Sequence, residues 1–235
     1  AAFAACDLDW SFFAVSVPDG RAGDALAAMR SLRLGGMSVT MPHKQAVAEL
    51  VDERTPVADR LGAVNCVGWR GTRLVGDSTD GPGFIDSLRV DHAFDPAGRR
   101  CLVVGAGGAA RAVIASLADA GASEVIVVNR TRDRGDRAAG LAGDRGRTGD
   151  AGEADGCDLV VNATPVGMAG DAGSPVPAEA LGPGQVVADL VYDPLETPLL
   201  ATARERGAVV VSGLGMLVHQ AAHAFRSWTG EDPPV

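Results

Sequence analysis

The stretch Cys101-Leu102-Val103-Val104-Gly105-Ala106-Gly107-Gly108 decides the fold of the longer part of this 235-residue chain. Its four apolar residues predict a buried strand, and the alanine-rich run 109–120 predicts a helix that ends before Gly121. A glycine-rich turn between a buried strand and a helix is typical of folds that bind a dinucleotide. We therefore expect a phosphate-binding turn that begins at Gly105.

Beyond this turn, apolar strands continue to alternate with helices. Further strands are predicted at 124–128, 159–161, 186–188 and 208–211, and 216–228 predicts a closing helix. β-Branched runs that alternate with helices indicate a parallel sheet covered on both faces. The segment 132–155 predicts a helix with a loose exit loop. Residues 141–157 are few for a helix plus a strand, which suggests that residues are missing there.

The first part of the chain predicts a smaller, mixed α/β unit. The expected elements are a helix at 22–32 stopped by Gly35-Gly36, a strand at 37–40, a helix to about Val51 with Pro42 in its first turn, a hairpin of 64–69 with 73–75, and a helix at 84–88. The chain opens at Ala1 in the middle of such a fold, so we expect its true N-terminus to be absent. The polar stretch 91–100 is the best boundary, which predicts domains at 1–90 and 91–212 and a final helix at 213–235.

Composition excludes several classes of function. The net charge of −9 argues against a nucleic-acid-binding surface, which needs a basic face. No apolar stretch approaches the roughly 18 residues that span a bilayer, so no membrane partner is expected. The four cysteines form no Cys-x-x-Cys pair, which predicts no metal site and reduced thiols in a cytoplasm.

The glycine-rich turn and the segment after the second strand together predict the cofactor. In the run Gly105, Ala106, Gly107, Gly108 and Ala109, the glycines allow a tight turn and close approach of a pyrophosphate. An NAD site places an acid about 20 residues further on, but here the segment reads Asn129-Arg130-Thr131 with Arg134 one turn later. Two guanidinium groups and a hydroxyl suit a 2′-phosphate, which predicts NADP.

Four segments carry polar residues where a core would not need them. They contain Thr40 with Lys44, Asn65, Asp80 and Gln220, in the runs 38–44, 62–65 and 76–81 and in the last helix. Each also has an ordinary structural explanation, since Asp80 can cap a helix and Lys44 or Gln220 can face solvent. Composition and spacing alone leave both explanations open.

Seven ordered motifs make the chain resemble the shikimate dehydrogenase family. The motifs are Ser38 to Lys44, Gly62 to Asn65, Thr79 to Gly81, Gly105 to Ala109, Asn129 to Thr131, Asn162 to Met168 and Gly213 to Leu217. The resemblance implies a substrate-binding first domain, a Rossmann domain that binds NADP, and a last helix that returns to the first domain. It also implies NADPH-dependent reduction of 3-dehydroshikimate to shikimate in chorismate and aromatic amino-acid biosynthesis.

The resemblance implies specific roles, carried over residue by residue. Lys44 matches the catalytic lysine and Asp80 its partner carboxylate. Substrate-binding positions match Thr40, Asn65 and Gln220, with Tyr192 near the substrate. Positions near the nicotinamide end of the cofactor match Thr164, Leu190, Gly213 and Met216. Members of the family begin with a Ser-x-Ser-Pro segment that binds the substrate carboxylate, and this sequence starts after that point. It has Cys66 for the usual Thr and Ser78 for the usual Asn.

Two alternative functions stay open at this stage. The first is a quinate/shikimate dehydrogenase that uses NAD or NADP, and the second is a non-catalytic NADP-binding module on the same fold. The arginines after Asn129 favour the leading interpretation over the first alternative, and the presence of both Lys44 and Asp80 speaks against the second. The expected partner is a small-molecule substrate, with the protein acting as a monomer or a homodimer.

Overall fold

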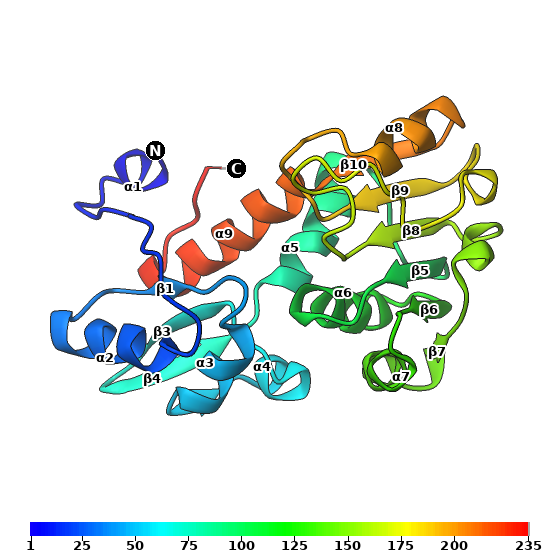
Figure 1. Cartoon of the computed structure of the whole chain (residues 1–235). Coiled ribbons are helices and arrows are strands. Elements are labelled where there is room, and N and C mark those ends of the chain that lie inside the picture. Colours follow the sequence, from blue (N-terminus) through cyan, green and yellow to red (C-terminus); the bar gives the residue numbers. More distant parts are fainter. Residues whose placement is uncertain (235) are drawn as a thin grey trace. The chain divides into compact units, whose positions relative to one another are not determined.

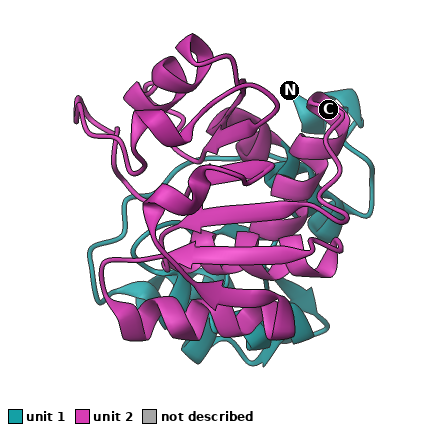
Figure 2. Ribbon diagram, turned by 90° about the vertical axis from the view of Figure 1, so that its right-hand side faces the viewer, with its two compact units in different colours: residues 1–79, 219–235 teal, residues 80–218 magenta. Residues whose placement is uncertain are grey.

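The computed structural model of the chain describes residues 1–234. They form two compact units, the first comprising Ala1–Thr79 with His219–Val235 and the second Asp80–Val218 (Figure 2). Helix α9 (Gly213–Thr229) contributes residues to both units. No helix among the described residues is long and apolar enough to cross a membrane.

The second unit contains a six-stranded, all-parallel sheet with the order β10-β9-β8-β5-β6-β7 (Figure 1). Numbered along the chain from β5, this is the order 3-2-1-4-5-6 of dinucleotide-binding folds, read from the β7 edge. The strands are β5 (Arg100–Val104), β6 (Glu124–Val128), β7 (Gly146–Thr148), β8 (Leu159–Asn162), β9 (Val186–Asp189) and β10 (Val209–Ser212). This confirms the predicted fold class of a mixed α/β unit with a Rossmann-type parallel-sheet domain.

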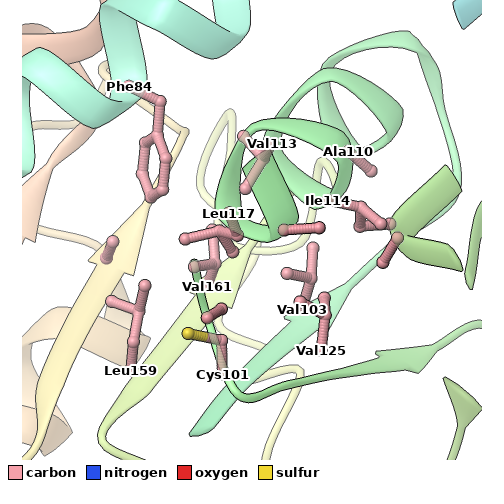
Figure 3. Packing of buried hydrophobic residues seen from close by; sticks show 14 of the residues in the cluster. Phe84, Cys101, Val103, Ala110, Val113, Ile114, Leu117, Val125, Leu159 and Val161 are labelled. Carbon is pink, nitrogen blue, oxygen red and sulfur yellow. The ribbon is translucent and has the colours of Figure 1, made fainter. Parts of the chain in front are cut away.

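Helices cover both faces of the parallel sheet because side chains of its strands point alternately to the two faces. Cys101 and Val103 pack in one apolar cluster with Phe84 and Leu117, while Leu102 packs in the other. Figure 3 shows the first cluster from close by. The covering helices are α5 (Asp80–Asp86), the π-helix η1 (Ser87–Asp91), α6 (Gly108–Asp119), α7 (Arg132–Ala139) and α8 (Pro198–Glu205), with the short 3₁₀ helices η2 (Gly140–Arg145), η3 (Ala151–Ala154) and η4 (Ala178–Ala180). The continuous apolar runs of the strands follow from this double burial.

The first unit is built on a four-stranded mixed sheet with the order β1-β3-β4-β2. Strands β3 (Cys66–Arg70) and β4 (Arg73–Asp77) form the predicted antiparallel hairpin, with Gly71 at φ 62° in its turn. The other elements are β1 (Met37–Ser38), β2 (Glu53–Arg54), α1 (Ala2–Ala5), α2 (Ala22–Leu32), α3 (Lys44–Leu50) and α4 (Pro56–Leu61). Leu26, Met29 and Val47 from the helices pack against the sheet to form its core.

Trp228 fixes the end of α9 in the first unit. Its indole Nε1 donates a hydrogen bond to the Val67 carbonyl at 3.0 Å. A Cβ on Gly36 would overlap the indole, so the absence of a side chain there makes room for it. The anchor helps to place Gln220, which lies two turns earlier on the same helix.

Several element boundaries differ from the prediction. Helix α3 begins at Lys44 rather than at Pro42, which lies in the preceding turn. Helix α2 ends because Arg33 adopts a left-handed conformation with φ 54°, before Gly35 is reached. Residues 141–157 do accommodate a strand, because β7 is only three residues long. The pattern also gave no indication of α1, α4, α8 or β2, which are short.

The predicted domains, 1–90, 91–212 and 213–235, stay a prediction. The two compact units of the structure have different limits. The division falls after Thr79 and after Val218. Residues 80–91 group with the parallel sheet because Phe84, Ile85 and Leu88 are buried in the cluster beneath α6.

Candidate functional site

The carboxyl ends of the parallel strands bring the predicted cofactor residues to one edge of the second unit. Val104 is paired with Val128 and with Asn162, and Asp189 is paired with Asn162 and with Ser212. The residues that immediately follow these strand ends are Gly105, Asn129, Ala163, Leu190 and Gly213. Ligands of parallel α/β sheets bind outside this edge.

The glycine turn has the geometry of a pyrophosphate cradle. Gly105 adopts φ 121°, and a Cβ there would lie 2.8 Å from the Ala163 carbonyl oxygen, so a side chain is excluded. At Gly107 a Cβ would meet no atom within 4 Å, which leaves open space in front of the backbone. Helix α6 begins at Gly108, so its unpaired N–H groups face this turn. The residues present therefore fit a dinucleotide.

The segment after β6 presents two arginines to solvent. Asn129 Nδ2 donates to the Thr131 carbonyl at 2.7 Å, and the same carbonyl accepts hydrogen bonds from the first turn of α7. Arg130, Thr131 and Arg134 are exposed. In the described part of the chain, neither guanidinium is paired with a carboxylate. The segment suits an added phosphate dianion.

The remaining predicted cofactor positions lie around the start of α9 and in the loops after β8 and β9. A Cβ on Gly213 would lie 2.5 Å from the Leu190 carbonyl oxygen, so glycine is required where the two segments approach. Thr164 is half-buried, and its Oγ1 donates to Asn162 Oδ1 at 2.7 Å. Met216 is buried in the same unit.

In the first unit, three neutral polar side chains meet. Asn65 Nδ2 donates to Thr79 Oγ1 at 3.0 Å and to Gln220 Oε1 at 3.3 Å, and Thr79 Oγ1 lies 3.4 Å from the same Gln220 oxygen. The Thr79 backbone N–H donates to Asn65 Oδ1 at 2.7 Å. We call this set, Asn65 with Thr79 and Gln220, the amide cluster. The sequence interpretation missed Thr79, although it stands in the motif that contains Asp80.

Backbone hydrogen bonds join the segment that holds Thr40 and Lys44 to the segment that holds Asn65, since Val39 N–H donates to the Asn65 carbonyl at 2.7 Å. The Lys44 carbonyl accepts a hydrogen bond from Val64 N–H at 2.9 Å, immediately before Asn65. Lys44 is half-buried and Thr40 is exposed. Cys66, which replaces the family's usual threonine, is 1% exposed, and burial raises the pKa of its thiol to about 12. It is therefore protonated and unreactive at neutral pH.

Asp80 and Tyr192 belong to the second unit. Asp80 is the first residue of α5 and is buried, and the next residue, Gly81, allows close packing because a Cβ there would overlap Ser116 Oγ. Tyr192 is exposed. Lys44 lies in the first unit and Asp80 in the second, so their joint action stays a prediction. Among residues 1–234, no His, Cys, Asp or Glu side chains gather in a group of three that could hold a metal ion.

These features first define a class. A parallel sheet of this order, with the Gly105 turn at its carboxyl edge, makes the chain a Rossmann-type dinucleotide-binding protein with a second α/β unit. Residues 1–67 match the shikimate dehydrogenase substrate binding domain, residues 90–148 the shikimate / quinate 5-dehydrogenase family, and residues 213–235 the shikimate 5′-dehydrogenase C-terminal domain.

Individual relatives agree with these matches. The chain is 45% identical to shikimate dehydrogenase (NADP(+)) of Moorella thermoacetica, over 100% of this chain and 83% of the relative. The solved shikimate 5-dehydrogenase of Thermus thermophilus in complex with NADP(H) and shikimate is 38% identical with a TM-score of 0.92, over 99% of this chain and 87% of that one. Quinate dehydrogenase of Corynebacterium glutamicum in complex with NAD is 33% identical with a TM-score of 0.85, over 94% and 82%. The chain belongs to the shikimate dehydrogenase family.

Proposed function

We propose that this chain is an NADP-dependent shikimate dehydrogenase that interconverts 3-dehydroshikimate and shikimate in chorismate and aromatic amino-acid biosynthesis. The observation that carries the proposal is the amide cluster, because three neutral hydrogen-bonding groups, two buried and one half-buried, gather in one place and suit the hydroxyl groups of a small polyol. The 45% identity to an NADP-dependent shikimate dehydrogenase along the whole chain supports the same substrate.

The cofactor is NADP, held along the carboxyl edge of the parallel sheet. The Gly105 turn and the start of α6 would hold the pyrophosphate. Arg130 and Arg134, with the Thr131 hydroxyl and Asn129, would hold the 2′-phosphate of the adenosine ribose. Thr164, Leu190, Gly213 and Met216 would border the nicotinamide, which supplies the hydride when bound.

Lys44 and Asp80 are the catalytic residues of the proposal. Reduction of a ring ketone leaves developing negative charge on its oxygen, and the Lys44 ammonium stabilises that charge and donates the proton. The Asp80 carboxylate assists by holding the lysine ammonium in the correct orientation. Thr40, Asn65 and Gln220, together with Tyr192, orient the other polar groups of the substrate. Positioning of this kind accounts for a large part of the rate of a two-substrate reaction.

A quinate/shikimate dehydrogenase that uses NAD or NADP is the second candidate function. The similarity to the quinate dehydrogenase of Corynebacterium glutamicum in complex with NAD favours it. Arg130 and Arg134 argue against NAD, because they stand where an NAD site has an acid. A non-catalytic binding module is disfavoured because both Lys44 and Asp80 are present.

The cellular setting is proposed on separate grounds. We place the enzyme in the cytoplasm because its buried cysteines have no disulfide partners in the described part of the chain, as is usual in a reducing compartment. It would act as a monomer or a homodimer on a small-molecule substrate.

A four-way assay of the purified chain tests the proposed function. Shikimate and quinate are each oxidised with NADP⁺ and with NAD⁺, and kcat/KM is determined for the four pairs. Shikimate with NADP⁺ is expected to be the best pair by at least about tenfold, which corresponds to about 1.4 kcal/mol of transition-state discrimination. A preference for quinate or for NAD⁺ would replace the proposal with the second candidate.

A further inference from the structure

We propose that Asp189 is a positioning residue: from the end of β9 its carboxylate sets the conformation of the two segments that border the nicotinamide, 162–168 and 190–197. The inference rests on the proposed function for the identity of the ligand. Asp189 itself is fully buried at 0% exposure and therefore acts through its neighbours.

The Asp189 carboxylate accepts three hydrogen bonds from groups that are themselves buried. Oδ1 accepts from Asn162 Nδ2 at 2.9 Å and from the Val191 N–H at 3.0 Å. Oδ2 accepts from Thr197 Oγ1 at 2.7 Å. Asn162, Val191 and Thr197 are all under 9% exposed. The Asp189 side chain is thus hydrogen-bonded to the end of β8 and to both ends of the segment 190–197, which follows β9.

The carboxylate and the Val166 carbonyl, which also accepts from Asn162 Nδ2 at 3.0 Å, together determine which way the Asn162 amide points. A carboxylate can only accept, so it must face the Asn162 NH₂ group and turn the amide oxygen toward the next segment. That oxygen then accepts from Thr164 N–H at 3.0 Å and from Thr164 Oγ1 at 2.7 Å. Asp189 thus acts on Thr164 through Asn162, alongside the backbone of Val166, whose N–H donates to Thr164 Oγ1 at 3.2 Å.

Thr197 connects the Asp189 carboxylate to the end of the segment 190–197 and to the start of α8. Its Oγ1 donates to Asp189 and accepts from Leu200 N–H at 3.3 Å, which caps α8. Gly167, at φ 91°, packs against it closely enough that a Cβ would lie 3.2 Å from Thr197 Cβ. The segments after β8 and β9 are therefore in direct contact as well as sharing the Asp189 carboxylate.

A carboxylate is a costly group for a purely structural purpose at this place. Burial raises the pKa of Asp189, opposed by its hydrogen bonds from Thr197, Val191 and Asn162, and no cation is among its hydrogen-bonding partners. A buried, hydrogen-bonded acid costs more desolvation free energy than an apolar side chain of the same shape. The orientation of Asn162 is the benefit that offsets this cost.

The test compares two residues of the same branched shape at position 189. Asp189→Leu removes all acceptors, and Asp189→Asn retains one oxygen for Asn162 and Val191. Asp158→Leu is the matched control, because Asp158 also accepts a backbone hydrogen bond but lies at the opposite end of β8. Calorimetry measures the affinity for adenosine 2′,5′-bisphosphate, which lacks nicotinamide, and NADPH fluorescence measures the affinity for the whole cofactor.

Asp189→Leu is expected to weaken NADPH binding roughly 10- to 100-fold and to change the bisphosphate affinity less than about twofold, because only the nicotinamide end is displaced. Asp189→Asn and Asp158→Leu are expected to stay within about threefold of wild type for both ligands. Equal losses for both ligands, or an unchanged NADPH affinity, would overturn the proposal.

If Asp189→Leu does not fold, Thr197→Val carries the same test, because it keeps the side-chain shape and removes one donor to the carboxylate. A selective loss of NADPH affinity, smaller than that for Asp189→Leu, supports the proposal, and an unselective or absent loss overturns it. Failure of the proposed function would be seen in a different measurement, as absence of shikimate oxidation with NADP⁺ by the wild-type chain. The two binding measurements contain no shikimate, so they test only the role of Asp189.

Discussion

The amide cluster of the first unit and the Asp189 network of the second unit use similar residues in different ways. The hydrogen bonds that reach Gln220 in the amide cluster are 3.3 and 3.4 Å long, whereas those to Asp189 are 2.7 to 3.0 Å. Gln220 is half-buried, while Asn162 and Asp189 are at 0% exposure. Long bonds between neutral groups can be exchanged for those of a ligand, and short bonds to a buried carboxylate fix a conformation. This difference is what we expect if the amide cluster binds a ligand and the Asp189 network positions one, as proposed above.

The largest effect is expected at Lys44, the proposed proton donor. Lys44→Ala should lower kcat for shikimate oxidation by roughly 10²- to 10⁴-fold, because the proton-transfer group is lost, with little change in shikimate affinity. Steady-state kinetics with NADP⁺ measure this, and Gln45→Ala, at the exposed neighbouring position, is the control. Turnover that survives in Lys44→Ala would remove the residue from the mechanism.

Arg130 tests the ligand-binding edge of the second unit independently of Asp189. Arg130→Ala should raise KM for NADP⁺ by roughly 10- to 100-fold and leave KM for NAD⁺ almost unchanged, since only NADP carries the 2′-phosphate. Arg132→Ala is the matched control, because the Arg132 side chain is 86% exposed two residues further along the chain. Equal changes for the two cofactors would refute the phosphate assignment.

Gln220 tests whether the amide cluster binds a ligand. Gln220→Leu removes the oxygen that Asn65 and Thr79 contact and should raise KM for shikimate about tenfold, the usual cost of leaving buried polar groups unpaired. KM for NADP⁺ should not change. A variant that loses stability but keeps its shikimate KM would make the cluster a positioning network like that of Asp189.

The smallest effect concerns stability and lies away from both networks. The hydrogen bond from Arg147 lowers the pKa of Glu153 from its ordinary value of 4.5 to about 2, helped by the Asp150 N–H. A depressed folded-state pKa gives stability that is present above pH 4.5 and is lost as the pH falls toward 2. Because the pair is partly exposed, Glu153→Gln should cost only about 1 kcal/mol at pH 7.

Urea unfolding at pH 7 and pH 3 measures this difference, with Glu179→Gln at an exposed position as the control. The cost of Glu153→Gln should shrink at pH 3. A cost that is equal at both pH values would show that the ion pair does not set the pKa of Glu153. Ligand affinities should stay unchanged in either case.

Local patterns predicted the long elements but not the short ones. Helix α2 and strand β6 have the predicted limits, because α2 carries a 3.6-residue apolar periodicity and β6 contains a continuous apolar run. Strand β7 has only three residues at a sheet edge and leaves no such pattern. Helix α8 was overlooked although Thr197 and Pro198 form a recognisable N-cap and first-turn pair.

The sequence predicted only those residues of the candidate site that lie in local motifs. The turn at Gly105 and the arginines after β6 are adjacent in sequence to strand ends, so their place at the sheet edge follows from the parallel fold. Thr79 and Asp189 gain their importance from partners that are far away in the chain, at Gln220 and Asn162. Such contacts depend on tertiary packing, which a single sequence does not display.

The central claim is that the amide cluster receives shikimate while the arginines after β6 receive the phosphate of NADP. Calorimetric titration of shikimate and of adenosine 2′,5′-bisphosphate into Gln220→Leu and Arg130→Ala tests it most directly. The account predicts that Gln220→Leu loses affinity for shikimate alone and Arg130→Ala for the bisphosphate alone. Loss of both ligands by either variant, or the reverse pairing, would contradict it.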